Sequence, residues 1–160
     1  MMDLLATLGA QRRHVRGIVA DLSEVDLRRP VLPSGWSCLG LINHLALDVE
    51  LFWFRAVVGG QADAIEELAT SPDAWQVGPD VPAYQVLDRY RQEIARADAV
   101  ITATPADAAP AWWPQGRSGG WRPRSHGEVL LHVITETACH AGHLDAAREL
   151  IDGRQWLVVD

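Results

Sequence analysis

Lysine is absent from the sequence, and all 14 of its basic residues are arginines. They are scattered along the chain and outnumbered by 21 acidic residues, which gives a net charge of −7. Nucleic-acid binding requires cations clustered on one surface, because the phosphates exchange their counterions for protein charges. The sequence therefore argues against a nucleic-acid partner.

Cysteine is also scarce, since the chain has only Cys38 and Cys139. Two cysteines are too few for a disulfide framework and are typical of a reducing compartment. No basic segment followed by a long apolar run opens the sequence, and polar residues interrupt each apolar run within about a dozen residues. We therefore expect a cytoplasmic protein without a membrane partner.

Helical periodicity dominates the chain, because apolar residues recur at three- and four-residue intervals over four long segments. The pattern predicts long helices at residues 3–22, 38–58, 82–102 and 125–151, and a short helix at 62–69. Prolines and glycines predict connections at 27–35, 61–81 and 105–124.

Capping residues support these helix boundaries. Ser37 and Ser125 are expected to cap the second and fourth long helices, and Glu128 to complete a capping box with Ser125. The sequence thus predicts an all-α four-helix bundle in one domain, residues 1–160. Its longer connections join helices 2 and 3 and helices 3 and 4.

A row of polar side chains interrupts the apolar pattern of the fourth predicted helix. At about 100° per residue, five of them share an arc of roughly 100°: His132, Glu136, Cys139, His140 and His143. An ionised glutamate in a bundle interior is costly unless a cation pairs with it. We therefore expect Glu136 and His140 to hold a positive ion. Cys139 is a candidate thiol ligand or nucleophile, although a small buried apolar role is favoured.

The second predicted helix contains a matching polar residue, His44, in an otherwise apolar stretch. His44, Glu136 and His140 together offer two imidazoles and one carboxylate, which leaves a fourth position open, as in catalytic zinc sites. Spacing alone equally allows a Glu–His hydrogen bond on one helix and a core histidine on the other. His132 and His143 are alternative or supporting ligands.

At these residues the sequence resembles the DinB-like (YfiT-like) superfamily of metalloenzymes, within an actinobacterial branch of unknown function. The resemblance covers nearly the whole chain and is strongest over residues 26–54, 89–101 and 132–153. In the superfamily, the metal is bound by one histidine of the second helix and an H-x-x-x-H pair of the last. Here Glu136 and His140 form that pair, and the change to glutamate is similar to mycothiol-dependent maleylpyruvate isomerase, whose zinc is held by two histidines and one glutamate.

The resemblance implies that His44, Glu136 and His140 bind a divalent metal ion, first of all Zn²⁺, although Ni²⁺, Fe²⁺ or Co²⁺ suit the same donors. Several relatives transfer low-molecular-weight thiols. Because the arginine-rich composition suggests a high-GC actinobacterial source, we expect mycothiol as the thiol and a small electrophile as its acceptor. A metal ion favours the thiolate form of a bound thiol, which is the nucleophile.

Further residues are expected around the three ligands. His143, Asp48 and His132 are candidates to orient the ligands through hydrogen bonds. The candidate substrate contacts are Trp36, Trp53, Trp113 and Arg122. The simpler alternative for the tryptophans is that they close the ends of the bundle.

Other functions fit the same ligand set. A hydrolase or isomerase could use metal-bound water in place of a thiol. A non-catalytic metal-binding stress-response protein would house the ion without turning over a substrate. The superfamily resemblance also suggests a homodimer.

Overall fold

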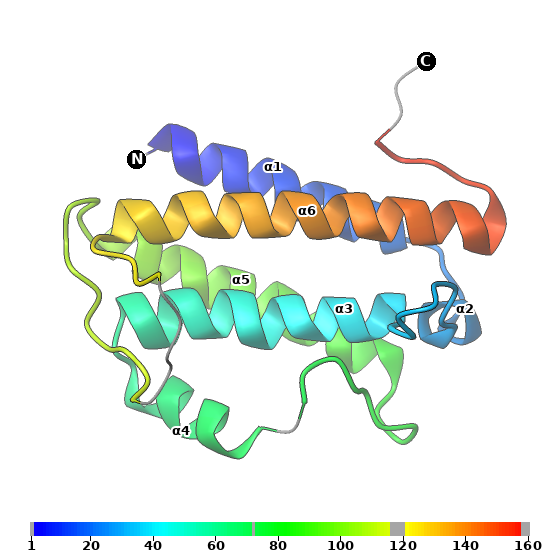
Figure 1. Ribbon diagram of the computed structural model, residues 1–160, viewed down its shortest axis with the longest axis horizontal. Coiled ribbons are helices and arrows are strands. Elements are labelled where there is room, and N and C mark those ends of the chain that lie inside the picture. The colour runs from blue at the N-terminus through cyan, green and yellow to red at the C-terminus, as the bar shows by residue number, and fades with distance from the viewer. Residues whose placement is uncertain (1, 72, 116–120, 158–160) are drawn as a thin grey trace.

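The computed structural model describes residues 2–71, 73–115 and 121–157, which are largely helical and contain no strand (Figure 1). Residues 116–120 of the predicted 105–124 connection therefore lie outside the described part. The helices are α1 (Met2–Val19), α2 (Glu24–Arg28), α3 (Cys38–His44), which continues as the π-helix η1 (Leu45–Val58), α4 (Ala62–Thr70), α5 (Ala83–Ala103) and α6 (His126–Asp152). The all-α prediction is confirmed. None of the described helices has the length and apolar character needed to cross a membrane.

The four long helices and α4 lie within a few residues of their predicted positions, but α2 was not predicted. The first helix ends before residue 22 because Asp21 adopts a left-handed conformation with φ 62°, which aspartate tolerates better than most residues. Ser23 then caps α2 by accepting the Asp26 N–H group.

The predicted caps are present, with one change of partner. Ser37 accepts the Gly40 N–H group at the start of α3, and Ser125 accepts that of Glu128 at the start of α6. The Glu128 carboxylate, however, accepts the backbone N–H of Arg124 rather than that of Ser125. Only half of the predicted capping box is therefore formed.

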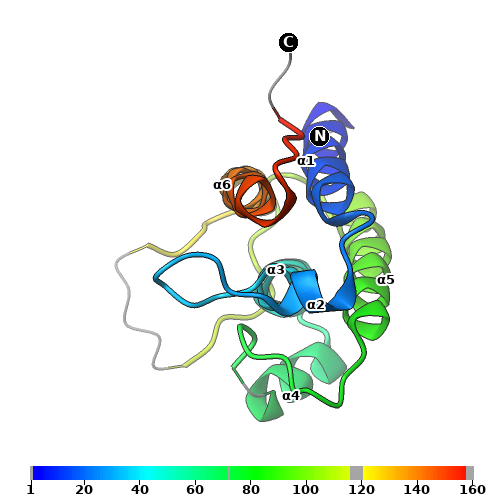
Figure 2. The same cartoon turned by 90° about the vertical axis from the view of Figure 1, so that its right-hand side faces the viewer.

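The helix formed by α3 and η1 runs through the middle of the bundle, with the other helices arranged around it (Figure 2). In η1 only Asp48 is exposed, which explains why this segment is apolar on nearly all sides. The winding of η1 was not predicted. Its last turn shows the wider spacing, because the Gly59 N–H donates to the Phe54 carbonyl five residues earlier, at 2.9 Å.

Two buried charge networks join the helices. In the first, the Arg12 guanidinium of α1 donates to both oxygens of Glu50 in η1, at 2.7 and 2.6 Å, and to Asp98 of α5 at 2.6 Å. Burial opposes the charge of Arg12, but the two carboxylates outweigh this effect and raise its pKa above the usual range. The network connects three helices through one buried cation.

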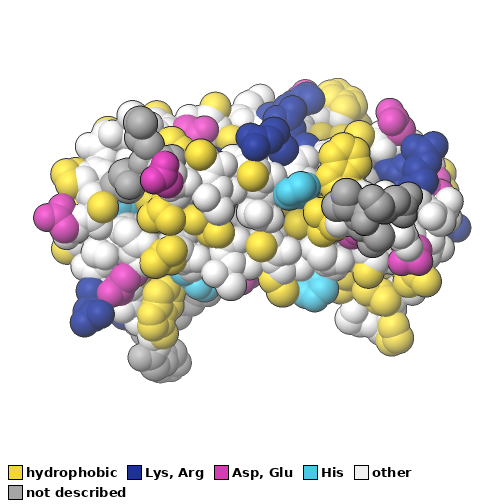
Figure 3. All heavy atoms as spheres, turned by 90° about the horizontal axis from the view of Figure 1, so that it is seen from above, with side chains coloured by type: hydrophobic (Ala, Val, Ile, Leu, Met, Phe, Trp, Pro, Cys, Tyr) yellow, Lys and Arg dark blue, Asp and Glu magenta, His cyan; other side chains and the backbone are white. Residues whose placement is uncertain are grey.

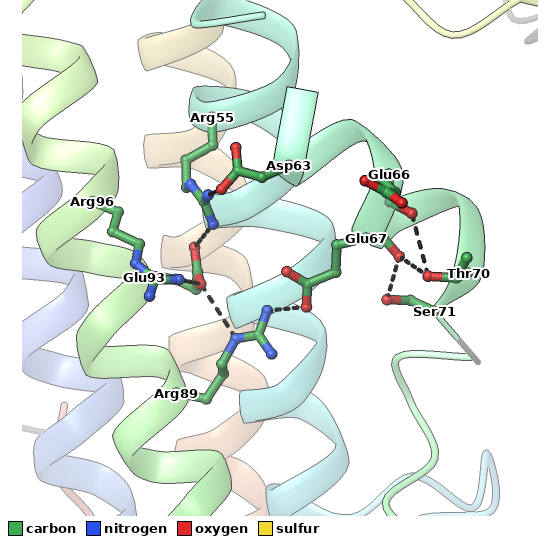
Figure 4. A network of polar contacts seen from close by, with 9 residues as sticks. All are labelled: Arg55, Asp63, Glu66, Glu67, Thr70, Ser71, Arg89, Glu93 and Arg96. Carbon is green, nitrogen blue, oxygen red and sulfur yellow. Dashed lines mark hydrogen bonds and ion pairs between the residues drawn. The ribbon is translucent and has the colours of Figure 1, made fainter. Parts of the chain in front are cut away.

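The second network links η1, α4 and α5 (Figure 4). Its centre is Glu93, which is fully buried and accepts from Arg55 at 3.0 Å, Arg96 at 2.8 Å and Arg89 at 3.2 Å. Arg55 also pairs with Asp63 of α4. These contacts hold α4 beside the central helix, where residues of α4 line a cavity together with Asp48.

Candidate metal centre

The three predicted metal ligands lie together between the central helix and α6. His44 occupies the last turn of α3, and Glu136 and His140 come from neighbouring turns of α6. Glu136 Oε1 lies 3.9 Å from His44 Nε2 and 3.1 Å from His140 Nε2. The two imidazole rings meet edge to face with centroids 5.0 Å apart. One potential ligand atom from each residue lies within 4.8 Å of the others.

Two neighbours hold the His44 ring. Its Nδ1 lies 2.9 Å from Asp48 Oδ2 one turn later, and Trp75 stacks on the ring at 4.2 Å with an interplanar angle of 19°. When Nδ1–H donates to the Asp48 carboxylate, Nε2 keeps a free lone pair. This nitrogen is buried and has no hydrogen-bond partner among the described residues. Asp48 thus contacts His44, and its role in orienting a metal ligand stays a prediction.

The other two residues differ in burial. Burial lowers the pKa of His140, and the nearby Glu136 carboxylate opposes this shift only in part. The imidazole of His140 is thus neutral at neutral pH, which is the form that binds a metal. Glu136 lies nearer the surface than expected, because its side chain is 35% exposed. A charge on this partly exposed carboxylate costs less free energy than a fully buried one, so a bound cation is favoured by the three donors together rather than by Glu136 alone.

This donor set fits a divalent ion. Zinc binds nitrogen and oxygen ligands at about 2.0–2.2 Å, which places tetrahedral ligand atoms about 3.3 Å apart. The two separations from Glu136 Oε1, 3.1 and 3.9 Å, bracket this value. The unpartnered nitrogen of His44, the neutral imidazole of His140 and the carboxylate of Glu136 could therefore hold one ion with small side-chain movements. Nickel, iron and cobalt suit the same donors.

The two remaining histidines of the predicted row have different surroundings. His143 is exposed, and its ring centroid lies 5.6 Å from that of His140. His132 packs against Trp53 and Trp121, with ring centroids at 4.6 and 4.9 Å. Burial lowers the pKa of His132. His143 thus lies beside the candidate centre, whereas His132 belongs to an aromatic cluster one turn away.

The candidate substrate contacts fall into two groups. Trp53 is buried and its ring lies 6.1 Å from that of Trp113, which Arg122 covers with its guanidinium 5.4 Å from the ring centroid. Trp36 lies apart from them, half-buried, with its ring 6.3 Å from that of His143. The structure places Trp53, Trp113 and Arg122 near one another, and their roles in substrate binding stay predictions.

The expectation for Cys139 was wrong. Its side chain is exposed and lies outside the cluster of three potential ligands, so it is not a small buried apolar residue. The polar residues of α6 spread over a wide arc of the helix surface, so those at the edge of this arc, including Cys139, reach solvent. Cys38, by contrast, is buried, and burial raises its pKa to about 11.

Trp75 is the residue of this site that the sequence did not reveal. It lies in the predicted 61–81 connection, where no periodicity assigns a side chain to a face. Local contacts place it: the Trp75 N–H donates to Asp73 Oδ1, and Asn43 of α3 donates to the Ala74 carbonyl at 2.7 Å. The stacked ring covers one side of His44.

The packing of Trp75 on the central helix depends on Gly40, because a Cβ atom there would meet the Trp75 carbonyl oxygen. We expect Gly40→Ala to lower the free energy of unfolding by about 1–3 kcal/mol and to displace the Trp75 ring from His44. Urea unfolding measures the first effect, and histidine chemical shifts the second.

Gly142 of α6 provides the matched control for this substitution. A Cβ atom there meets nothing within 4 Å, so Gly142→Ala should stabilise the protein by about 0.5–1 kcal/mol. Equal effects of the two substitutions would contradict the packing argument.

A cavity of about 390 Å³ adjoins the candidate centre at Asp48. It lies between η1, α4 and the chain after residue 111, and most of its wall is apolar. The lining side chains are Asp48, Phe52, Ile65, Leu68, Ala69, Trp112, Pro114 and Gln115. A small apolar molecule would fit there, next to the carboxylate that contacts His44.

The described structure is an all-α bundle, and a His–Glu–His cluster lies between its central and last helices. The protein is therefore a helical protein with a candidate metal centre. The family model described as mycothiol-S-transferase matches residues 3–153, and the chain belongs to this family. The match confirms the predicted relation to mycothiol-related DinB-like proteins, and the family implies a thiol substrate. No curated protein and no solved structure matches the sequence.

Proposed function

We propose that this protein is a divalent-metal-dependent transferase that joins mycothiol to a small electrophile. One observation carries the proposal: in a chain matched by the mycothiol-S-transferase family over residues 3–153, His44, Glu136 and His140 form one cluster that could hold a metal ion. Zn²⁺ is the proposed ion, because a borderline cation suits two imidazoles and a carboxylate.

The three side chains would hold the ion, each in a form suited to that task. His44 offers a buried lone pair on Nε2 when its Nδ1–H donates to Asp48, and burial keeps His140 neutral. Glu136 contributes the negative charge. A bound divalent ion lowers the pKa of a coordinated thiol from about 8.5 and so favours the thiolate at neutral pH.

The overall reaction is a substitution at the electrophile. The thiol gives up its proton to solvent, its sulfur bonds to the electrophilic carbon, and the leaving group departs with the electron pair of the broken bond. The apolar cavity beside Asp48 is the proposed place for the electrophile, because it adjoins the ligand cluster and suits an aromatic or aliphatic body.

The family match favours thiol transfer over the alternatives. Hydrolysis or isomerisation would use the same ligands, so only the assay separates them from transfer. A non-catalytic metal-binding protein would keep the ion and turn over no substrate. The homodimer and the cytoplasmic location stay predictions.

The direct test is an assay with mycothiol and two acceptors, monochlorobimane and chlorodinitrobenzene. We expect conjugation above the uncatalysed rate with Zn²⁺-loaded protein, loss of that rate after dialysis against a chelator, and recovery when Zn²⁺ is restored. Elemental analysis of the same samples measures the bound metal. Fully loaded protein that gives only the uncatalysed rate with mycothiol would overturn the proposal.

A further inference from the structure

One cavity of the described structure lies away from the candidate metal centre. Its volume is about 620 Å³, and its walls come from α1, α5, Ile42 of α3 and Trp156 near the C-terminus. Figure 2 shows α1 and α5 side by side, on the opposite side of α3 from the loop that precedes α6. Ile42 and His44 are two residues apart and so point about 200° apart around α3. The cavity is thus separate from the ligand cluster.

Basic side chains surround this cavity in a chain whose net charge is −7. Arg13 and Arg16 of α1 and Arg91 of α5 line it. Arg91 pairs with Asp88, whereas Arg13 and Arg16 have neither an ion pair nor a hydrogen bond within the described part of the chain. One carboxylate, Asp21, lies in the lining. Figure 3 views the molecule from the side of α1 and α6 and shows dark blue basic side chains next to yellow apolar ones.

Tyr90 gives the cavity a third polar group without a partner in the described chain, after Arg13 and Arg16. Its side chain is only 1% exposed, lines the cavity, and has a hydroxyl group without a hydrogen-bond partner among the described residues. Burial and the nearby Glu50 carboxylate raise the pKa of Tyr90 above its usual range, so the buried hydroxyl keeps its proton. Natural proteins rarely leave such a group unsatisfied.

The rest of the wall is apolar. Leu22, Ile42 and Leu87 line it, and Trp156 packs closely on α1 beside Gly17, where a Cβ atom would overlap the indole ring. Asp145 holds the chain in this position by accepting the N–H of Trp156 at 2.7 Å. A flat apolar body would therefore find contact surface next to the unpaired guanidinium groups.

We propose that this cavity binds a small organic anion, with a carboxylate or sulfonate group on an apolar ring. Arg13 and Arg16 pair with the acidic group, the Tyr90 hydroxyl donates to it, and the ring packs against Leu87 and Trp156. This site is independent of the metal centre and of the proposed thiol transfer.

The test uses the full-length folded protein and 1-anilinonaphthalene-8-sulfonate as the probe. We expect one bound molecule per chain by calorimetry, and a dissociation constant raised at least about tenfold in the double variant Arg13→Gln/Arg16→Gln. Arg124→Gln, at an exposed site outside the cavity, should bind as the wild type does. The uncharged N-phenyl-1-naphthylamine should bind the wild type and the double variant equally.

Tyr90→Phe separates the hydroxyl contact from a structural role. It should weaken binding of the sulfonate several-fold while leaving the melting temperature unchanged or higher, because the lost hydroxyl has no partner in the free protein. Equal sulfonate affinity of the double variant and the wild type would overturn the proposal, as would the absence of one-to-one binding to the wild type.

Discussion

Replacing His44 by alanine is expected to release the divalent ion and to reduce thiol transfer by about 100- to 1,000-fold. His44 is the one member of the cluster on the central helix, so its loss leaves only Glu136 and His140, both on α6, around the ion. Metal content by elemental analysis and the rate of mycothiol conjugation measure the two effects. Circular dichroism establishes that the variant is folded.

Two further variants make this test specific. Asp48→Asn keeps all three ligands but weakens the contact to His44 Nδ1, so metal affinity should fall only about 10- to 100-fold. His14→Ala removes an imidazole of α1 that contacts Trp156 and should leave metal content and rate unchanged. Full metal content and an unreduced rate in His44→Ala would rule out the proposed ligand set.

Replacing Arg12 by methionine is expected to destabilise the protein by about 3–5 kcal/mol. The substitution leaves Glu50, 1% exposed, with an unpaired carboxylate inside the bundle. In a domain of this size the loss corresponds to a fall of roughly 10 °C in melting temperature. Burial raises the pKa of Glu50, so the variant is less unstable at pH 5, where this carboxylate takes up a proton more readily, than at pH 8.

Removing both charges tests the reason for that loss. In Arg12→Met/Glu50→Leu no buried charge remains at this pair, so most of the lost stability should return. Arg13→Met is the matched control, because the neighbouring Arg13 is exposed and should change stability by less than about 0.5 kcal/mol. A double variant as unstable as Arg12→Met alone would show that the pair contributes by packing rather than by charge compensation.

The periodicity of the sequence was sufficient for the long helices, because helix boundaries depend on nearby residues. Ser37, Ser125 and Gly153 act within one turn of the helix ends that they define. The π-helical winding of η1 and the short helix α2 were not predicted, because neither gives a recognisable spacing of apolar residues in the sequence. The half-formed capping box shows the same limit, because the neighbouring backbone N–H groups of Arg124 and Ser125 were both possible donors to the Glu128 carboxylate.

For the candidate centre, the chain by itself determined which residue types stand one turn apart: Glu136 with His140, and His44 with Asp48. Those pairs follow from the helix repeat. Only the tertiary structure decided that the two pairs meet, that Trp75 stacks on His44, and that Cys139 and part of Glu136 reach solvent. The reason is physical: the helix repeat sets the angles between side chains on one helix, whereas the packing of separate helices and loops sets which faces are covered.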